Sequence, residues 1–136
     1  MAGLYIHIPY CRRKCSYCDF FSVANTSTVE AYIDAVVAES RLRKDELRGE
    51  GLRTIYIGGG TPSVLGIGQI QRLVEGIRSV FDTSEVEEFT IEVNPEGVGR
   101  DYVEGLRETG INRVSIGIQS FDDEELKMIN RRHSAA

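Results

Sequence analysis

The sequence predicts an α/β fold in which crossover helices join the strands of a parallel sheet. Four stretches alternate apolar and polar residues with the period of two that is typical of strands, and a helical pattern follows each of them. A helix between two strands returns the chain to the same end of the sheet, so this order requires parallel pairing. The 136 residues are too few for a complete eight-stranded barrel, which takes roughly 200 or more.

The first half of the chain contains two predicted strands and the start of a helix. Residues 4–8 form the first strand. Ser27 and Glu30 have the spacing of a capping box, so we expect them to cap the first helix. Residues 54–57 form the second strand, which runs directly into a glycine turn at 58–62.

The second half continues the same alternation. Apolar residues at helical spacing predict an amphipathic helix over 70–81, and residues 89–94 form the third strand. A short helix follows and is closed by Gly110, a common residue just after a helix end. Residues 114–119 form the fourth strand, and Asp122 caps the final helix.

The two faces of the predicted sheet differ in polarity. One face is apolar and is expected under the helices: Leu4, Ile6, Ile8, Ile55, Ile57, Phe89, Ile91, Val93, Val114, Ile116 and Ile118. The other face is polar or small: Tyr5, His7, Tyr56, Gly58, Thr90, Glu92, Asn94, Arg113, Ser115, Gly117 and Gln119. Parallel strands covered on both faces are apolar on both. The polar face therefore predicts that one side of the sheet lines a cavity, as in half of a barrel.

Composition and charge exclude several classes of protein. Hydrophobic residues make up 41% of the chain and charged residues 27%, which is typical of a globular protein. The net charge of −5 disfavours a general nucleic-acid binder, which normally has a basic excess. No apolar run approaches the ~18 residues of a membrane span, and His7, Pro9 and the basic residues 12–14 interrupt any secretory signal. We expect a cytoplasmic protein.

The three cysteines of the chain all lie in one loop, at Cys11, Cys15 and Cys18. An odd number of thiols in one short loop does not make a disulfide framework. Zinc normally takes four ligands, and no second pair of cysteines follows, so a zinc-binding module is the weaker alternative. Three thiolates can hold three irons of a [4Fe–4S] cluster and leave the fourth iron open to a small molecule.

Cys-x3-Cys-x2-Cys after a first strand resembles the signature of the radical S-adenosylmethionine (SAM) superfamily. Further motifs narrow the resemblance to the family of oxygen-independent coproporphyrinogen III oxidases and the related heme chaperones, and they occur in that family's order. They are LYIHIPYC at 4–11, YCDF at 17–20, GGGTPS at 58–63, EVNP at 92–95, NRVSIGIQSF at 112–121 and RRH at 131–133.

The resemblance implies a fold and two cofactors. Residues 1–136 would be the amino-terminal part of a radical SAM core, the first four strands of a partial barrel, with the carboxy-terminal half absent. The cluster loop would be 11–18 and the glycine turn 58–62. Cys11, Cys15 and Cys18 would hold a [4Fe–4S] cluster, and SAM would chelate the open iron.

The resemblance also implies a set of SAM contacts. Gly59, Gly60 and Thr61 would lie at the methionine part, and Tyr5 and Tyr17 near the cluster and the sulfonium. Glu92 and Gln119 would be polar contacts, with Arg131 on the carboxylate. Tyr5, Glu92 and Gln119 lie on the polar face identified independently of the family.

Each of these residues also has a purely structural interpretation. The glycines are equally suited to a tight turn between strand and helix. Glu92 could pair with Arg113, Gln119 could end a strand, and Arg131 could lie on a solvated helix face.

The resemblance leaves two functions open. A heme chaperone would bind heme and pass it to an acceptor protein. A coproporphyrinogen III oxidase would use an electron donor and a 5′-deoxyadenosyl radical for oxidative decarboxylation of propionates, as an oxidoreductase of the coproporphyrinogen dehydrogenase type. Phe20 favours the chaperone, because the oxidases carry a further cysteine two positions after the third cluster cysteine. Whether the protein is an enzyme is open at this point.

Overall fold

The computed structural model describes residues 2–12, 16, 19 and 22–135. A four-stranded sheet forms its centre, with the strand order β1-β2-β3-β4 and every neighbouring pair parallel. The strands are β1 (Ala2–Ile8), β2 (Leu52–Gly59), β3 (Glu88–Val93) and β4 (Arg113–Ile116). The predicted parallel α/β fold is confirmed.

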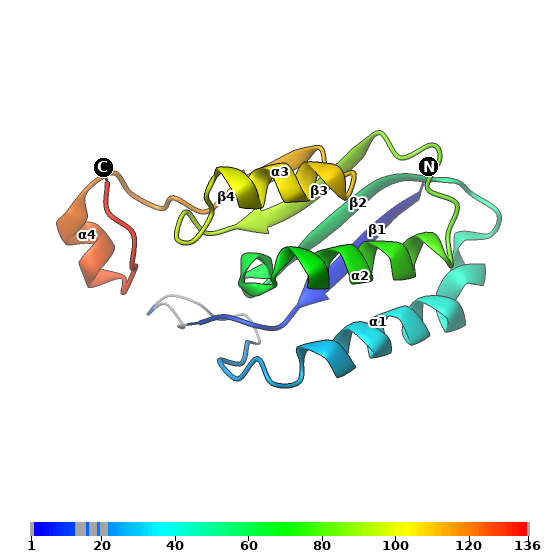
Figure 1. The fold of residues 1–136 in the computed structure, drawn as a ribbon, viewed down its shortest axis with the longest axis horizontal. Helices are drawn as coiled ribbons and strands as arrows, with labels where there is room; N and C mark the ends of the chain where they lie inside the picture. Colours follow the sequence, from blue (N-terminus) through cyan, green and yellow to red (C-terminus); the bar gives the residue numbers. More distant parts are fainter. Residues whose placement is uncertain (1, 13–15, 17–18, 20–21, 136) are drawn as a thin grey trace.

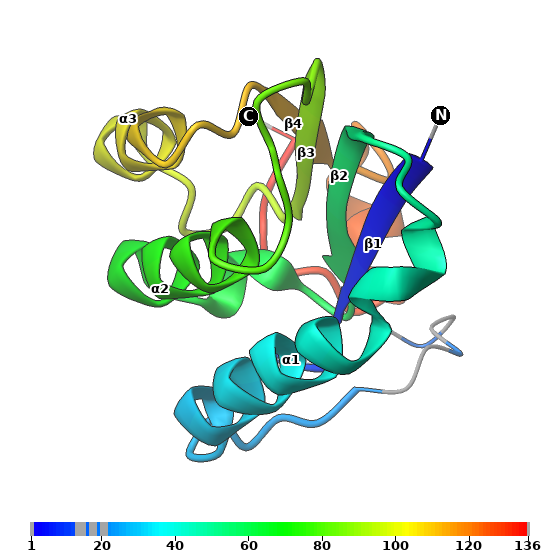
Figure 2. The ribbon, with the colours of Figure 1, turned by 90° about the vertical axis from the view of Figure 1, so that its right-hand side faces the viewer.

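Three helices cover one face of this sheet (Figures 1 and 2). They are α1 (Val29–Arg43), α2 (Ile67–Arg78) and α3 (Arg100–Glu108). Two short 3-10 helices, η1 (Lys44–Leu47) and η2 (Pro62–Val64), lie in the connections. The last helix, α4 (Asp123–Met128), lies apart from the other three, beyond the carboxyl ends of the strands (Figure 1). None of the helices in the described part of the chain is long and apolar enough to cross a membrane.

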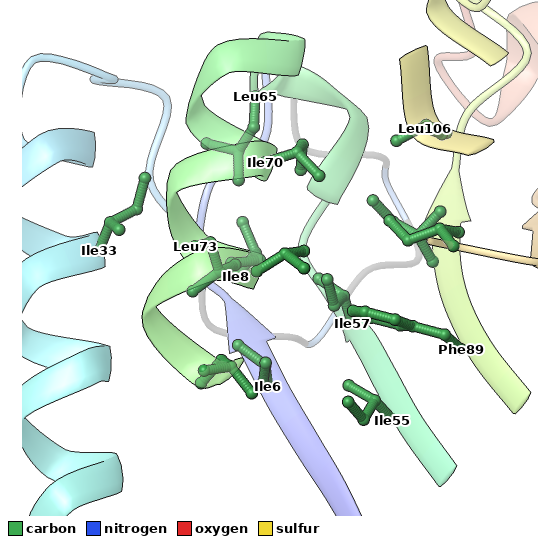
Figure 3. Packing of buried hydrophobic residues seen from close by; sticks show 14 of the residues in the cluster. Ile6, Ile8, Ile33, Ile55, Ile57, Leu65, Ile70, Leu73, Phe89 and Leu106 are labelled. Atoms are coloured by element: carbon green, nitrogen blue, oxygen red, sulfur yellow. The ribbon is translucent and has the colours of Figure 1, made fainter. Parts of the chain in front are cut away.

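The hydrophobic core lies between the sheet and the three helices (Figure 3). Ile8 and Ile57 from the strands and Ile70 and Leu73 from α2 are fully buried there. Burial of each such side chain contributes roughly 1.5–3 kcal/mol. The apolar face predicted for the first three strands is therefore the face that packs under the helices.

The fourth strand is shorter than its pattern predicts. We expected a strand over 114–119 with Ile116 and Ile118 under the helices, but β4 ends at Ile116 and that side chain is 53% exposed. The strand lies at the edge of the sheet, and the helix after it lies beyond the strand ends instead of covering it. The apolar pattern is present, but no described helix covers this part of the chain.

The expected capping box at the start of α1 is also wrong. Thr28 is the residue that precedes the helix, and no side chain caps the backbone there. The Thr28 hydroxyl instead lies 2.7 Å from the hydroxyl of Tyr10, and Glu30 pairs with Arg72 of α2. Tertiary partners have therefore replaced the local bonds. The cap predicted for α4 does form, since Asp122 accepts hydrogen bonds from two backbone amides.

The polar side chains predicted for the second face lie in register across the sheet. Tyr5 pairs with Tyr56, Tyr56 with Thr90, and Thr90 with Arg113. Such partners in a parallel sheet point to the same side. This face is opposite the layer of α1, α2 and α3 (Figure 2). The residues of the candidate site lie at its carboxyl end.

Candidate functional site

The glycine turn extends the pairing between β1 and β2 beyond the strands. The amide of Gly60 donates to the carbonyl of Ile8 at 2.8 Å, and the amide of Thr61 donates to the carbonyl of Tyr10 at 2.7 Å. A Cβ atom on Gly60 would lie 2.6 Å from the oxygen of Tyr10, so no side chain fits there. Gly59 has a φ of +117°, a conformation that favours glycine. The turn therefore holds the start of the cysteine loop tightly against the end of β2.

Thr61 connects this turn to the first cysteine. Its hydroxyl donates a hydrogen bond to the sulfur of Cys11 at 3.2 Å. The amide of Cys11 donates to the carbonyl of Val23, and the amide of Val23 donates to the carbonyl of Pro9, which closes the base of the loop. Cys15, Cys18, Tyr17 and Phe20 lie outside the described residues.

Glu92 on β3 contacts the glycine turn. Its carboxylate accepts a hydrogen bond from the hydroxyl of Tyr56 at 2.7 Å and from the amide of Gly59 at 3.1 Å. The alternative pair with Arg113 does not form, because Arg113 contacts Glu88 instead. The hydrogen bond to Glu92 is the main reason that the pKa of Tyr56 is raised.

Tyr5 lies beside Tyr56, on the solvent-exposed side of the hydrogen-bonded group around Glu92. Its ring stacks on the ring of Tyr56 with centroids 6.1 Å apart, and its hydroxyl lies 3.1 Å from Nδ1 of His7. Burial, followed by the nearby Glu92 carboxylate, raises the pKa of the Tyr5 phenol. The ring is nevertheless 57% exposed, so it remains accessible to a ligand.

Arg131 lies in the segment after α4 and is half-buried, not on a solvated helix face. One terminal nitrogen of its guanidinium donates to Oδ1 of Asn94 at 2.9 Å. Its Nε is buried and has no hydrogen-bond partner among the residues that the structure describes. A buried guanidinium N–H without a partner is costly, and a carboxylate would satisfy it.

Gln119 approaches this arginine at Gly117. A Cβ atom on Gly117 would lie 3.3 Å from Nε2 of Gln119, 3.3 Å from a terminal nitrogen of Arg131 and 3.5 Å from Oδ1 of Asn94. Three polar side chains therefore converge on one glycine. Gln119 itself has a φ of +70°, which places it in the left-handed region just beyond the end of β4.

A small cavity of about 50 Å³ brings several of these groups together. Its lining includes the predicted residues Cys11, Thr61 and Arg131, together with Asn94. Tyr5 does not line it, but lies along a separate groove of about 500 Å³ between β1 and α1. The structure thus divides the predicted residues into a cavity at the end of the sheet and a group around Glu92.

Asn94 was missed as a functional residue, because the sequence suggests only a strand that stops before Pro95. Its place on the polar face, at the carboxyl end of β3, is the signal that pointed to this site.

The side chains present fit a carboxylate ligand beside a soft metal centre. The unpartnered Nε of Arg131 suits a carboxylate, and a thiolate at Cys11 is a soft ligand. Within residues 2–12, 16, 19 and 22–135, no three His, Cys, Asp or Glu side chains are grouped to hold a metal ion. Two of the three predicted cysteine ligands lie outside those residues, so the ligand set stays a prediction.

Comparisons with known proteins agree with the resemblance in the sequence. The family described as the Radical SAM superfamily matches residues 5–136. The chain is 42% identical over 131 residues to the heme chaperone HemW of Lactococcus lactis, covering 96% of this chain and 34% of that protein. It is 40% identical over 133 residues to HemW of Escherichia coli, covering 96% of this chain and 35% of that one.

A solved structure has the same fold. It is coproporphyrinogen III oxidase (HemN) from Escherichia coli, described as a radical SAM enzyme, with a TM-score of 0.87 and 32% identity over 97% of this chain. The match covers 31% of that structure. The chain therefore spans about a third of the length of the relatives that it matches.

Proposed function

Because the chain belongs to the radical SAM superfamily, we propose that it binds SAM beside a [4Fe–4S] cluster and forms the amino-terminal part of a heme chaperone. One observation carries the first half of this proposal. Cys11 and Arg131 line the same cavity, and the buried Nε of Arg131 has no hydrogen-bond partner among the described residues. A ligand with a carboxylate and a metal-chelating amine matches that pair of groups.

In this proposal Cys11, Cys15 and Cys18 hold three irons of the cluster. When bound and reduced, the cluster supplies the electron that cleaves a carbon–sulfur bond of SAM. Thr61 fixes Cys11 by its hydrogen bond, and Arg131 neutralises and orients the carboxylate of SAM.

The other predicted contacts take supporting roles in this proposal. Glu92, held by Tyr56 and Gly59, presents a fixed carboxylate beside the glycine turn formed by Gly59 and Gly60. Gln119 contributes an amide beside Arg131. The exposed ring of Tyr5, with Tyr17, would cover the cluster and the sulfonium.

Heme transfer is proposed from the names of the relatives and from the identity of residue 20. Two of those relatives are heme chaperones. Phe20 stands at the sequence position where, by the family resemblance, the oxidases have a cysteine. The complete protein would bind heme or a related porphyrin and deliver it to an acceptor protein, with an electron donor reducing the cluster. Decarboxylation of a porphyrinogen is the second candidate, favoured by the structural match to the oxidase.

Anaerobic reconstitution with iron and sulfide tests the cluster and SAM. We expect a brown protein with about four irons per chain and the visible absorbance of an iron–sulfur cluster. Both the iron content and the absorbance should be lost in the single variants Cys11→Ala, Cys15→Ala and Cys18→Ala. SAM should bind to the reconstituted chain in calorimetry. A colourless zinc protein, or three variants with unchanged iron content, would contradict the proposal.

A second experiment separates the two candidate functions. The complete protein is incubated anaerobically with coproporphyrinogen III, SAM and a reductant, and is titrated separately with heme. The chaperone proposal expects heme binding without protoporphyrinogen formation. Turnover to protoporphyrinogen supports the oxidase, and failure to bind heme overturns the chaperone.

A further inference from the structure

Asn94 joins the two ends of the cavity through its side-chain amide. Its Nδ2 donates to Oγ1 of Thr61 at 3.3 Å, and its Oδ1 accepts from Arg131 at 2.9 Å. The Thr61 hydroxyl in turn donates to the sulfur of Cys11 at 3.2 Å. A continuous row of hydrogen bonds therefore runs from the cysteine sulfur to the guanidinium, through residues of four different segments.

We propose that Asn94 is the positioning residue that sets the Arg131 guanidinium relative to the Cys11 sulfur, so that Nε of the arginine faces the carboxylate of SAM. This inference rests on the proposed function. Asn94 need not touch the ligand, because it acts through Arg131.

The chemistry of the amide explains why an asparagine suits this position. An amide carries a donor and an acceptor on one rigid group, so it can bind a hydroxyl oxygen on one side and a guanidinium on the other. A carboxylate would offer only acceptors, and alanine neither. The backbone of Asn94 is fixed as well, since its amide donates to the hydroxyl of Ser63 at 3.2 Å.

Arg131 needs such a partner because its segment follows α4, which lies apart from the three helices that cover the sheet. Its backbone amide bonds only locally, to the carbonyl of Leu126 in α4. The neighbouring Arg132 pairs with Glu96 at 3.1 Å, two residues after Asn94. The end of β3 is thus where this segment meets the sheet, and the bond to Asn94 is the contact that orients the Arg131 side chain.

The space around Arg131 allows the guanidinium to turn if Asn94 is removed. Gly117 leaves the position beside it without a side chain, and a Cβ there would be 3.3 Å from a terminal nitrogen of Arg131. The half-buried arginine would then have no fixed acceptor among the described contacts on the sheet. Removal of the Asn94 side chain should therefore weaken the binding of a ligand that has the carboxylate more than the binding of a ligand that lacks it.

The test compares SAM with decarboxylated SAM, which lacks only the carboxylate, on the anaerobically reconstituted chain. Dissociation constants are measured by calorimetry for the unmodified protein, Asn94→Ala, Arg131→Gln and the double variant. We expect Asn94→Ala to weaken SAM about tenfold and the decarboxylated compound much less, because a hydrogen bond to a charged group is lost. In the Arg131→Gln background, Asn94→Ala should have little further effect.

Asn112 supplies a matched control. Its side-chain amide also bridges two groups, here the backbone amide of Phe89 and the backbone carbonyl of Glu87, but at the opposite end of the sheet. Asn112→Ala should lower the melting temperature without changing the ratio of the two dissociation constants. Asn94→Asp keeps the shape of the side chain and covers the case in which the alanine variant does not fold. Its added negative charge beside Arg131 should weaken SAM more than the decarboxylated compound.

The outcomes separate this inference from the function on which it rests. If the unmodified chain takes up a cluster but binds SAM no better than the decarboxylated compound, both proposals fail. If it prefers SAM and Asn94→Ala keeps that preference, only the role of Asn94 is overturned. An equal loss from Asn94→Ala with and without Arg131 also overturns it, since the residue would then not act through the arginine.

Discussion

The hydroxyl of Thr61 donates a hydrogen bond to the sulfur of Cys11 at 3.2 Å, although the two residues are 50 positions apart in the chain. Hydrogen bonds to sulfur ligands stabilise the additional negative charge of a reduced iron–sulfur cluster. If Cys11 binds a cluster, Thr61 therefore helps to set its reduction potential.

Thr61→Val should lower the midpoint potential of the reconstituted cluster. Valine keeps the shape of threonine but removes the donor, and a loss of about 1 kcal/mol corresponds to roughly 40 mV for a one-electron couple. A redox titration followed by electron paramagnetic resonance measures the shift. Thr109→Val is the control, because that buried hydroxyl bonds to the carbonyl of Leu106 in α3. Equal potentials in all three proteins would contradict the prediction.

Gly60→Ala should destabilise the protein by at least about 2 kcal/mol, because the added Cβ would lie 2.6 Å from the backbone oxygen of Tyr10. Gly68→Ala should have the opposite effect. Gly68 is the second residue of α2, with nothing within 4 Å of the added atom, so alanine there should gain up to about 1 kcal/mol, the difference between the two residues in a helix interior. Urea denaturation measures both. A tolerated Gly60→Ala would mean that the turn can move away from β1.

Stability should fall in alkaline solution through Tyr102. Burial raises the pKa of this phenol from 10.0 to about 12, while its hydroxyl donates to the carbonyl of Leu65. The neutral phenol is therefore favoured in the folded state, so its contribution is complete below pH 10 and is lost as the pH rises toward about 12. Urea unfolding across that interval should show a steeper loss for the unmodified protein than for Tyr102→Phe. Parallel curves would refute the assignment.

The chain should self-associate in solution through its fourth strand. β4 is an edge strand, Ile116 on it is 53% exposed, and the following Phe121 is 79% exposed. Such edges promote pairing with other chains, and a lysine at the edge opposes it. Ile116→Lys should therefore lower the mass found by light scattering. Leu42→Lys, on the exposed surface of α1, should leave it unchanged. A monodisperse monomer before any substitution would show the prediction to be wrong.

The parts of the fold that follow from local patterns could be predicted from the sequence. Alternating residues identified the four strands and the buried face of three of them, because side-chain direction along a strand depends on the strand alone. The predicted capping box was wrong because Glu30 pairs with Arg72 on another helix. The predicted length of β4 was wrong because an apolar residue such as Ile116 is buried only where another element covers it.

The site could be predicted only where a motif named its residues. Cys11, Thr61 and Arg131 were expected near one ligand, and the structure brings them to one cavity. Asn94 lies in the EVNP motif and on the polar face, but no role beyond the strand end was expected of it, because its partners lie 33 and 37 positions away in the chain. Contacts of this kind exist only after the chain has folded.

The segment after β4 contacts the end of β3 through two arginines: Arg131 bonds to Asn94, and Arg132 pairs with Glu96. A bond between His133 and the carbonyl of Ile118 joins the two ends of the segment itself. A ligand that binds Arg131 adds a further link across this junction. By thermodynamic reciprocity, the free energy by which the ligand secures the segment equals that by which the secured segment strengthens ligand binding. Docking of the last 20 or so residues onto the sheet is then coupled to ligand binding. The rate at which proteases cut this segment should therefore fall as the fraction of ligand-bound protein rises.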